Sequence, residues 1–310
     1  TRLFPILKTE TADSEVNFMK QRVITAVVLL ALLAVVVWQI YTPLFIIVIA
    51  FLSAVAANEI MKCAKVSNKF IMILGTAVGA IIPFTSSENI MQPWISAEKW
   101  SHFISIVPPL AFAVIVIIAF FLAMIFDYEH TKFEDVAVSI VASIAVPYGF
   151  SMFGMLRDMY DYKAQLGVYL IFYGLITALG TDTGAQLGGM ALGKHKMAPH
   201  ISPKKTKEGA VCGVCASFVL NVAAMLLYNK FAYVPLGKHM VATLLIAEPF
   251  ISFLSMMGDL SASVLKRNFD VKDFGKIFPG HGGVMDRFDS SLFSIPLTYC
   301  VVEIFNNAMK

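Results

Sequence analysis

Residues 104–126 read ISIVPPLAFAVIVIIAFFLAMIF, a stretch without a single charged side chain. A membrane-spanning helix needs roughly 20 mostly apolar residues, so this stretch is long enough to cross a bilayer. The whole chain has the same character: 58% of its 310 residues are hydrophobic and 15% are charged. An ordinary soluble domain has about 45–50% apolar and about 25% charged residues. The sequence therefore predicts an all-α, polytopic membrane protein.

Further apolar stretches follow one another along the chain, separated by short polar connections. They predict about nine transmembrane helices, near 23–39, 42–60, 70–86, 104–126, 135–153, 165–190, 209–228, 240–262 and 284–307. No polar connection is long enough to fold as a second domain, so residues 19–310 are expected to form a single transmembrane domain. Residues 1–18 are polar and unpatterned, and we interpret them as a disordered tail or an expression remnant.

The positions of the basic residues predict the orientation of the chain. With a cytoplasmic N-terminus, 18 of the 24 Lys and Arg residues fall on the cytoplasmic side and 6 on the other. This asymmetry satisfies the positive-inside rule. The two most polar connections, 191–208 and 263–283, then lie together on the cytoplasmic side, where a soluble nucleotide arrives.

Other global features argue against several classes of protein. The net charge of +3 is small and gives no reason to expect a nucleic-acid partner. Cys63, Cys212, Cys215 and Cys300 lie in or beside apolar segments, which argues against a secreted disulfide framework. Cys212 and Cys215 have CxxC spacing, but no second pair or histidine lies nearby, so we interpret them as small residues at a helix–helix contact.

The segment 263–289, SVLKRNFDVKDFGKIFPGHGGVMDRFD, concentrates charge beside an apolar helix. Charge in that position is costly and tends to mark function. Lys266 and Arg267 are cationic donors suited to phosphate oxygens. The glycines around His281 allow backbone N–H groups to approach an anion closely. Asp286 and Asp289 are three residues apart, and carboxylates so placed can hold Mg²⁺.

The spacing within this segment resembles that of the phosphatidate cytidylyltransferases, also called CDP-diacylglycerol synthases. The matching residues are Ser263, Lys266-Arg267, Lys272-Asp273, Pro279-Gly280-His281-Gly282-Gly283, Asp286-Arg287 and Asp289. Gly258-Asp259-Leu260, Thr181-Asp182-Thr183-Gly184-Ala185, Ser202-Pro203-Lys204-Lys205-Thr206 and Glu208-Gly209 also look like family motifs. The close resemblance covers about residues 165–290, the expected catalytic part. Two positions depart from the family: Ala262 replaces a common Glu, and Lys207 a common aromatic residue.

The resemblance implies an enzyme that makes CDP-diacylglycerol and pyrophosphate from CTP and phosphatidic acid in phospholipid biosynthesis, with Mg²⁺ as cofactor. The implied metal ligands are Asp259 and Asp286, with Asp289 and Asp182 as further candidates. The implied catalytic residues are Asp259, Asp286, Lys266, Arg267, Asp273 and His281. The implied substrate-binding residues are Ser202, Lys204, Lys205, Thr206, Glu208, Ser263, Lys272, Gly282, Gly283 and Arg287. The expected partners are CTP, phosphatidic acid and membrane lipids, with a homodimer left open and no nucleic acid.

Several alternatives stay open at this point. A CTP-dependent polyprenol or phytol kinase shares the membrane setting and the nucleotide. A transporter is a different class, although it favours charges near the midplane and paired repeats, whereas here the charges gather at one surface of the C-terminal half. Lys204, Lys205 and Lys207 also suit a basic loop that sets topology. Asp182 also suits a hydrogen-bonded structural role, and His281 a turn or a phosphate contact.

Overall fold

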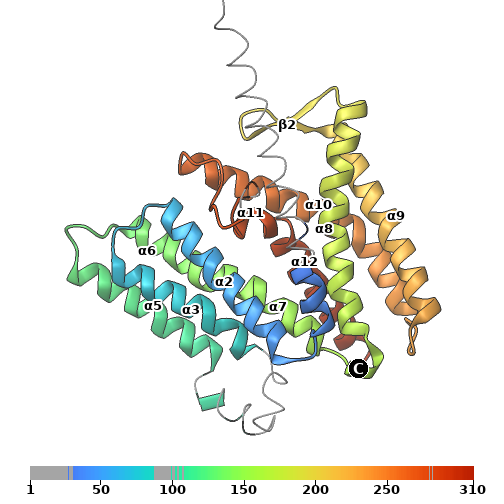
Figure 1. Cartoon of the computed structure of the whole chain (residues 1–310), viewed down its shortest axis with the longest axis horizontal. Helices are drawn as coiled ribbons and strands as arrows, with labels where there is room; N and C mark the ends of the chain where they lie inside the picture. Colours follow the sequence, from blue (N-terminus) through green and yellow to red (C-terminus); the bar gives the residue numbers. More distant parts are fainter. Residues whose placement is uncertain are drawn as a thin grey trace, which may run out of the picture.

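A computed structural model describes residues 27, 31–86, 99, 102, 105–106, 108–278, 280 and 282–310, and these residues are mostly helical (Figure 1). The prediction of an all-α fold is confirmed. The helices are α2 (Pro43–Cys63), α3 (Lys69–Thr85), α5 (Pro109–Phe126), α6 (Phe133–Ile140), the π-helical turn η1 (Val141–Ala145), α7 (Val146–Asp158), the 3₁₀ turn η2 (Tyr162–Ala164), α8 (Leu166–Leu192), α9 (Lys207–Phe231), α10 (Lys238–Asn268), α11 (Met285–Phe288) and α12 (Ser291–Ala308). Strands β1 (Lys196–Ala198) and β2 (Ser202–Thr206) pair as an antiparallel hairpin.

Within the described ranges, six helical segments are long and apolar enough to cross a membrane. They are α2, α5, the continuous helix Phe133–Asp158 that contains α6, η1 and α7, and the helices α8, α9 and α10. Helix α3 is apolar but has only 17 residues. The count of nine spans is not confirmed. Of the first predicted span, 23–39, the structure describes residue 27 and residues 31–39, and 31–38 are helical. The last predicted span is divided into the short α11 and the longer α12 because a polar segment interrupts it.

The described helices form two groups that meet along α7. Helices α2, α3, α5, α6 and α7 form the N-terminal group, and α8, α9, α10 and α12 form the C-terminal group (Figure 1). Helix α7 packs against α2 and α3 on one side and against α8 and α12 on the other. The two groups are therefore joined by direct packing and not only by the chain connection.

Helices α8 and α9 form the most extensive contact in the C-terminal group, and small residues make it close. A Cβ atom on Gly213 would lie 2.6 Å from the Thr181 carbonyl oxygen, so a larger residue does not fit there without a shift. Cys212 packs against the position of Gly188 in the same contact. Close approach through small residues is a common means of helix association in membranes.

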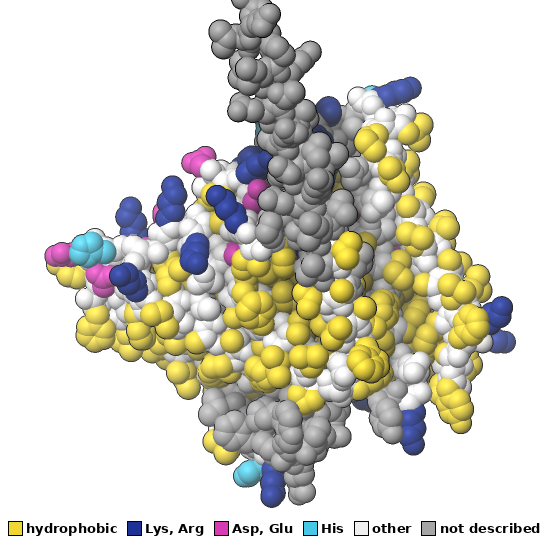
Figure 2. All heavy atoms as spheres, in the orientation of Figure 1, with side chains coloured by type: hydrophobic (Ala, Val, Ile, Leu, Met, Phe, Trp, Pro, Cys, Tyr) yellow, Lys and Arg dark blue, Asp and Glu magenta, His cyan; other side chains and the backbone are white. Residues whose placement is uncertain are grey.

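The surface of the molecule carries a broad hydrophobic band. Figure 2 shows hydrophobic side chains across the middle of the visible face, with charged side chains gathered toward its edges. Phe126 and Ile246 are 85% and 80% exposed, respectively, which suits contact with lipid tails. This band supports the multi-pass membrane character predicted from the sequence.

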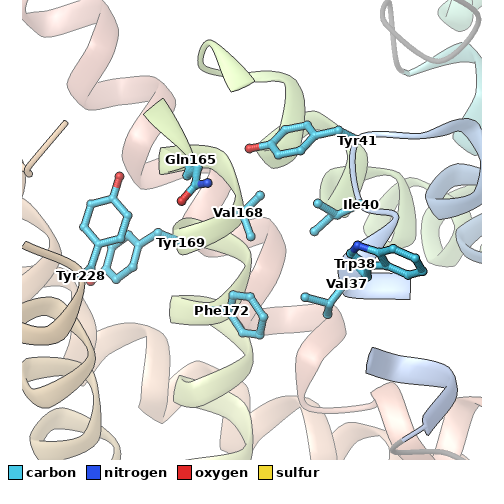
Figure 3. A pocket seen from close by; sticks show the side chains of 9 residues that line it. All are labelled: Val37, Trp38, Ile40, Tyr41, Gln165, Val168, Tyr169, Phe172 and Tyr228. Carbon is cyan, nitrogen blue, oxygen red and sulfur yellow. The ribbon is translucent and has the colours of Figure 1, made fainter. Parts of the chain in front are cut away.

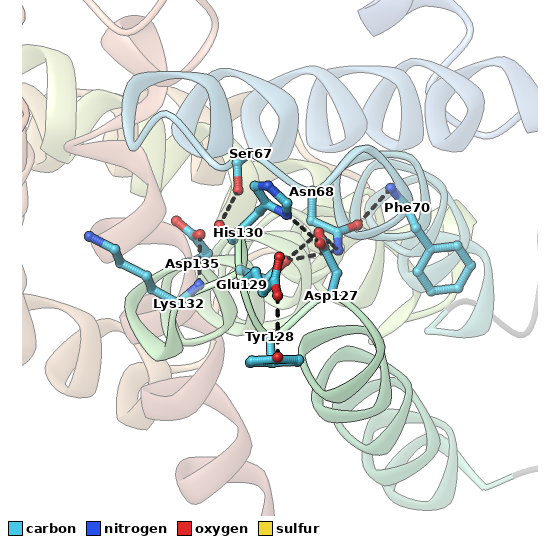
Figure 4. Close-up of polar contacts among 10 residues, drawn as sticks. Ser67, Asn68, Phe70, Asp127, Tyr128, Glu129, His130, Lys132 and Asp135 are labelled. Atoms are coloured by element: carbon cyan, nitrogen blue, oxygen red, sulfur yellow. Dashed lines mark hydrogen bonds and ion pairs between the residues drawn. The ribbon is translucent and has the colours of Figure 1, made fainter.

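A polar cluster joins the α2–α3 loop to the α5–α6 loop (Figure 4). The Oδ1 atom of Asn68 accepts hydrogen bonds from the first N–H groups of α3, and its Nδ2 group donates to Asp127 and Thr131. The hydrogen bond from His130 to Asp127, followed by that from Thr131, holds the pKa of Asp127 below its usual range. The cluster places both loops at the same end of the N-terminal group.

Candidate active site

Asp182, Asp259 and Asp289 come from three segments that meet around Ser290. The Ser290 Oγ group donates to Asp182 Oδ2 on α8 over 2.7 Å. Its backbone N–H donates to Asp289 Oδ1 over 2.8 Å. Its carbonyl oxygen accepts from Ser255, one helical turn before Asp259 on α10. A single turn between α11 and α12 therefore ties α8 to α10.

The electrostatics of Asp289 reflect this convergence. Burial raises the pKa of its carboxyl group from 3.8 to about 7, and the negative charge of Asp259 raises it further as the next cause. Like charges at a buried position repel one another, and a cation placed among them relieves that repulsion. The Asp289 region is therefore electrostatically suited to a positive ligand.

The carboxylates of this region match the ligand requirements of Mg²⁺ only in part. In the part of the chain that the structure describes, no three His, Cys, Asp or Glu side chains are already arranged as a set of metal ligands. Mg²⁺, however, usually keeps several waters and binds through one or two carboxylates plus substrate phosphates. Asp259 and Asp289, with Asp182 beside them, fit that requirement, since waters and a bound phosphate group would supply the further oxygen ligands.

Lys205 brings a positive charge to this site from the β1–β2 hairpin. Its Nζ atom lies 2.5 Å from Asp259 Oδ2, and the two side chains are 21% and 25% exposed, so the ion pair is partly screened by solvent. The next residue, Thr206, caps α9 by accepting a hydrogen bond from the Gly209 N–H group. The cap fixes the end of the hairpin, and with it the direction from which Lys205 approaches α10.

Glu208 anchors the other strand of the hairpin, at its start. Its Oε2 atom accepts hydrogen bonds from the backbone N–H groups of Lys194 and His195, and its Oε1 atom contacts the His195 ring. Both oxygens of this predicted substrate-binding residue are thus engaged within the protein. Ser202 lies in β2 opposite Ala198.

Asp286 organises the loop that precedes it. Its Oδ1 atom accepts from Lys266 Nζ over 2.9 Å, and its Oδ2 atom accepts from the N–H groups of Phe274 and Gly283 over 2.8 and 3.0 Å. Its side chain is 5% exposed. The sequence predicted that Asp259 and Asp286 share a metal ion, whereas in the structure each carboxylate has its own lysine, Lys205 for Asp259 and Lys266 for Asp286.

The glycine-rich turn forms as its sequence requires. Gly280 and Gly282 have φ angles of 74° and 83°, a left-handed backbone region that favours glycine. The Phe278 N–H group donates to the Gly282 carbonyl oxygen and closes the turn. Pro279 and His281 lie outside the described residues, so the predicted role of His281 stays a prediction.

The other predicted site residues line the solvent-facing side of this region. Ser263 is half-buried on α10, one turn after Asp259. The remaining ones are exposed: Lys204, Arg267, Lys272, Asp273 and Arg287. Long cationic side chains at such positions can reach phosphate oxygens that arrive from solvent.

Sequence reasoning missed two residues that shape the site. Ser290 bonds to both Asp182 and Asp289, yet nothing in its sequence context marks it. Glu59 on α2 accepts hydrogen bonds from the Val284 and Met285 N–H groups at the start of α11. A buried glutamate in an otherwise apolar stretch is a signal of function that the sequence did contain.

A cavity of about 420 Å³ lies elsewhere in the molecule and is lined largely by apolar and aromatic side chains (Figure 3). Trp38, Tyr41, Tyr169 and Tyr228 are among its lining residues. Tyr169 and Asp182 are 13 residues apart on α8, which corresponds to about 20 Å along a helix. The cavity is therefore separate from the carboxylate site.

Comparison with known proteins identifies the family. The sequence model of the cytidylyltransferase family matches residues 20–305. The chain is 32% identical to the phosphatidate cytidylyltransferase of Bacillus subtilis (strain 168), over 93% of this chain and 99% of that protein. It is 32% and 34% identical to phosphatidate cytidylyltransferases of Staphylococcus aureus (strain COL) and Staphylococcus epidermidis (strain ATCC 12228 / FDA PCI 1200), each over 90% of this chain and 97% of the relative. The similarity thus extends well beyond residues 165–290, and the chain belongs to the cytidylyltransferase family.

Proposed function

We propose that the protein is a phosphatidate cytidylyltransferase that makes CDP-diacylglycerol and pyrophosphate from CTP and phosphatidic acid. The observation that carries this proposal is the similarity to relatives of that name over at least 90% of the chain. The site adds chemical support, because two carboxylates, each ion-paired with a lysine, lie beside membrane-spanning helices.

The reaction requires charge neutralisation and alignment more than proton transfer. A phosphate oxygen of phosphatidic acid forms a bond to the α-phosphorus of CTP, and the bond between that phosphorus and the pyrophosphate oxygen breaks. The attacking oxygen is already negatively charged, so no strong base is needed. Fixed cations that face the developing charge lower the barrier. Lys205 and Lys266 occupy such fixed positions, because each is paired with a carboxylate.

We assign Mg²⁺ binding to Asp259 and Asp289, with Asp182 beside them. When bound, Mg²⁺ supplies neutralising charge for the phosphate oxygens of the nucleotide. Asp286 suits this role less well, because both of its oxygens already accept hydrogen bonds from the protein. We assign to Asp286 instead the positioning of Lys266.

We further propose that the site faces the cytoplasm. The hairpin that carries Lys204 and Lys205 and the loop around Lys272 and Lys276 are both rich in lysine, which the positive-inside rule places on that side. CTP then reaches the site from solution while phosphatidic acid reaches it from the membrane.

The direct test uses purified protein in mixed micelles with CTP, Mg²⁺ and phosphatidic acid. We expect CDP-diacylglycerol and pyrophosphate in equal amounts, and no pyrophosphate when phosphatidic acid is left out. The Asp259→Asn variant serves as the matched negative control. A parallel reaction in which a polyprenol or phytol replaces phosphatidic acid tests the kinase alternative, which the formation of CDP and the phosphorylated alcohol would establish.

A further inference from the structure

Glu59 connects the N-terminal group of helices to the loop that carries the family motif. It lies in α2, is 6% exposed, and accepts hydrogen bonds from Val284 N over 3.2 Å and from Met285 N over 3.0 Å. The first N–H groups of a helix have no partner within that helix. A carboxylate more than 200 residues away in the sequence therefore satisfies the start of α11.

Two glycines make room for this carboxylate. A Cβ atom on Gly275 or on Gly283 would overlap the Glu59 side chain. Since both glycines border the same group, the loop closes around Glu59 from two sides. Gly283 has an ordinary backbone conformation in this structure, so the need for glycine there is one of space and not of backbone freedom.

A second residue of α2 holds the same loop. Cys63, one helical turn after Glu59, is buried and donates its Sγ–H group to the Phe274 carbonyl oxygen over 3.1 Å. The N–H group of Phe274 donates to Asp286. Helix α2 thus contacts both ends of the segment 274–285. Asp286, the residue directly after this segment, links the same two regions because it accepts hydrogen bonds from Phe274 and Gly283.

Three consecutive N–H groups therefore bind two carboxylates. Gly283 donates to Asp286, whereas Val284 and Met285 donate to Glu59. This arrangement fixes the orientation of α11, from which Asp286 holds Lys266. The turn that follows α11 carries Asp289 and Ser290 toward Asp182 and Asp259.

We infer that Glu59 is a positioning residue of the active site, which acts through the segment 274–285 to hold Lys266 and Asp289 in place. The N-terminal helices are then part of the catalytic apparatus and not only a membrane anchor. For its activity readout this inference rests on the proposed function, whereas its structural readout is independent of it.

The variants Glu59→Gln and Glu59→Asp separate the charge from the shape of the side chain. Glutamine offers only one acceptor oxygen and turns its NH₂ group toward a backbone N–H group, so one of the two donors loses its partner. Aspartate keeps both acceptors on a shorter side chain.

We expect kcat to fall about 10- to 100-fold in Glu59→Gln, with the KM for CTP within about threefold of wild type. We expect Glu59→Asp to recover part of that loss. Glu134→Gln, which changes an exposed glutamate on α6, is the matched control and should retain wild-type rates.

A double-mutant cycle with Gly283→Ala tests the contact itself. Gly283→Ala alone should lower kcat, because the new methyl group meets the Glu59 carboxylate. In a Glu59→Ala background that methyl group has room, so the second substitution should add little damage. Strong non-additivity supports a direct contact, and additive losses would contradict it.

Limited trypsin digestion supplies the readout that does not depend on activity. Lys276 is exposed within the segment 274–285, and Lys272 is exposed two residues before it. We expect faster cleavage there in Glu59→Gln than in wild type or Glu134→Gln, at detergent and temperature conditions where all three remain folded by size-exclusion chromatography. Faster cleavage in a protein that makes no CDP-diacylglycerol would reject the proposed function but keep the positioning role. Wild-type cleavage together with wild-type kcat in Glu59→Gln would overturn the inference.

Discussion

The Nζ atom of Lys205 lies 2.5 Å from the Oδ2 atom of Asp259, although the two residues come from a β-hairpin and from a long membrane helix. This contact joins the polar connection 191–208 to α10, four residues before the polar connection 263–283 begins. It places a cation next to a carboxylate that we assign to Mg²⁺ binding. Lys205 is therefore in a position to stabilise phosphate charge and to hold Asp259 in place.

Replacement of Lys205 tests whether its ion pair with Asp259 contributes to catalysis. We expect Lys205→Ala to lower kcat/KM for CTP about 10- to 100-fold, because it removes a fixed cation and leaves Asp259 without its partner. The exposed neighbour Lys204 is the matched control, and Lys204→Ala should have a smaller effect that weakens further at high salt. Equal losses in both variants would indicate a diffuse basic patch in place of a specific ion pair.

The Mg²⁺ dependence of activity distinguishes Asp289 from Asp286. We expect Asp289→Asn to raise the Mg²⁺ concentration needed for half-maximal activity and to lower the maximal rate by orders of magnitude, since metal charge stabilisation is worth several kcal/mol. Asp286→Asn should also lower the rate, because asparagine keeps only one acceptor oxygen, so either Lys266 or the two backbone N–H groups lose their partner, and Lys266 loses its counter-charge.

The two variants should nevertheless differ in their Mg²⁺ titrations. Asp286→Asn should keep the wild-type half-maximal Mg²⁺ concentration, because its effect is on the loop and not on the metal. The reverse pattern, a shifted titration in Asp286→Asn and a normal one in Asp289→Asn, would restore Asp286 as the ligand that the sequence alone suggested.

The stability of the metal-free protein should respond to Asp289 with a defined pH dependence. Burial raises the pKa of Asp289 to about 7, above its usual 3.8, so ionisation costs more in the folded than in the unfolded state. That cost is absent below about pH 4, grows as the pH rises toward 7 and is complete above it. In EDTA at pH 8 we therefore expect Asp289→Asn to unfold roughly 3–6 °C above wild type, as a gain of about 1–2 kcal/mol implies.

The same measurement at low pH provides the control. Near pH 4 both proteins carry a neutral side chain at position 289, so their unfolding temperatures should converge. A lower unfolding temperature of Asp289→Asn at pH 8 would show that the carboxylate is stabilised in the folded protein and would contradict the electrostatic account. Thermal unfolding in detergent, followed by tryptophan fluorescence, measures both cases.

Cysteine labelling tests the orientation of the site. With Cys212, Cys215 and Cys300 replaced and the buried Cys63 kept as the labelling background, Lys276→Cys should react with a membrane-impermeant maleimide only from the cytoplasmic side, whereas Lys238→Cys should react only from the opposite side. Both positions are exposed, and Lys238 lies at the start of α10, a helix length away from the loop that carries Lys276. Labelling of Lys276→Cys from outside would reverse the assigned topology.

The sequence predicted those parts of the fold that depend on local composition. Apolar stretches predicted most of the helices, because the cost of placing polar groups in lipid acts on each segment separately. The start of the 104–126 stretch was predicted too early: α5 begins at Pro109, and proline is favoured in the first turn of a helix because its missing N–H group needs no partner there. The spacing of the motif residues also identified the family from the sequence alone.

The pairing of site residues could not be predicted in the same way. A carboxylate is less available to a cation when donors of the protein already occupy both of its oxygens. Both oxygens of Asp286 accept such hydrogen bonds, whereas for Asp289 the Ser290 N–H group donates to Oδ1, and this difference exists only in the folded chain. Glu59 and Val284 are 225 residues apart in the sequence, so no local pattern connects them.

The contact between α8 and α9 holds Asp182 in position, because Gly213 of α9 packs against Thr181, the residue before Asp182 on α8. Gly213→Ala should destabilise the protein by about 1–3 kcal/mol, since the new Cβ atom would lie 2.6 Å from the Thr181 carbonyl oxygen and force the helices apart. Displacement of Thr181 also moves the adjacent Asp182, so kcat should fall in the fraction that remains folded. Gly237→Ala is the matched control, because a Cβ atom there meets nothing within 4 Å. Unfolding temperatures and rates of the two variants, measured side by side in the same detergent, should differ clearly, and equal behaviour would mean that the α8–α9 contact tolerates a wider spacing than its glycines indicate.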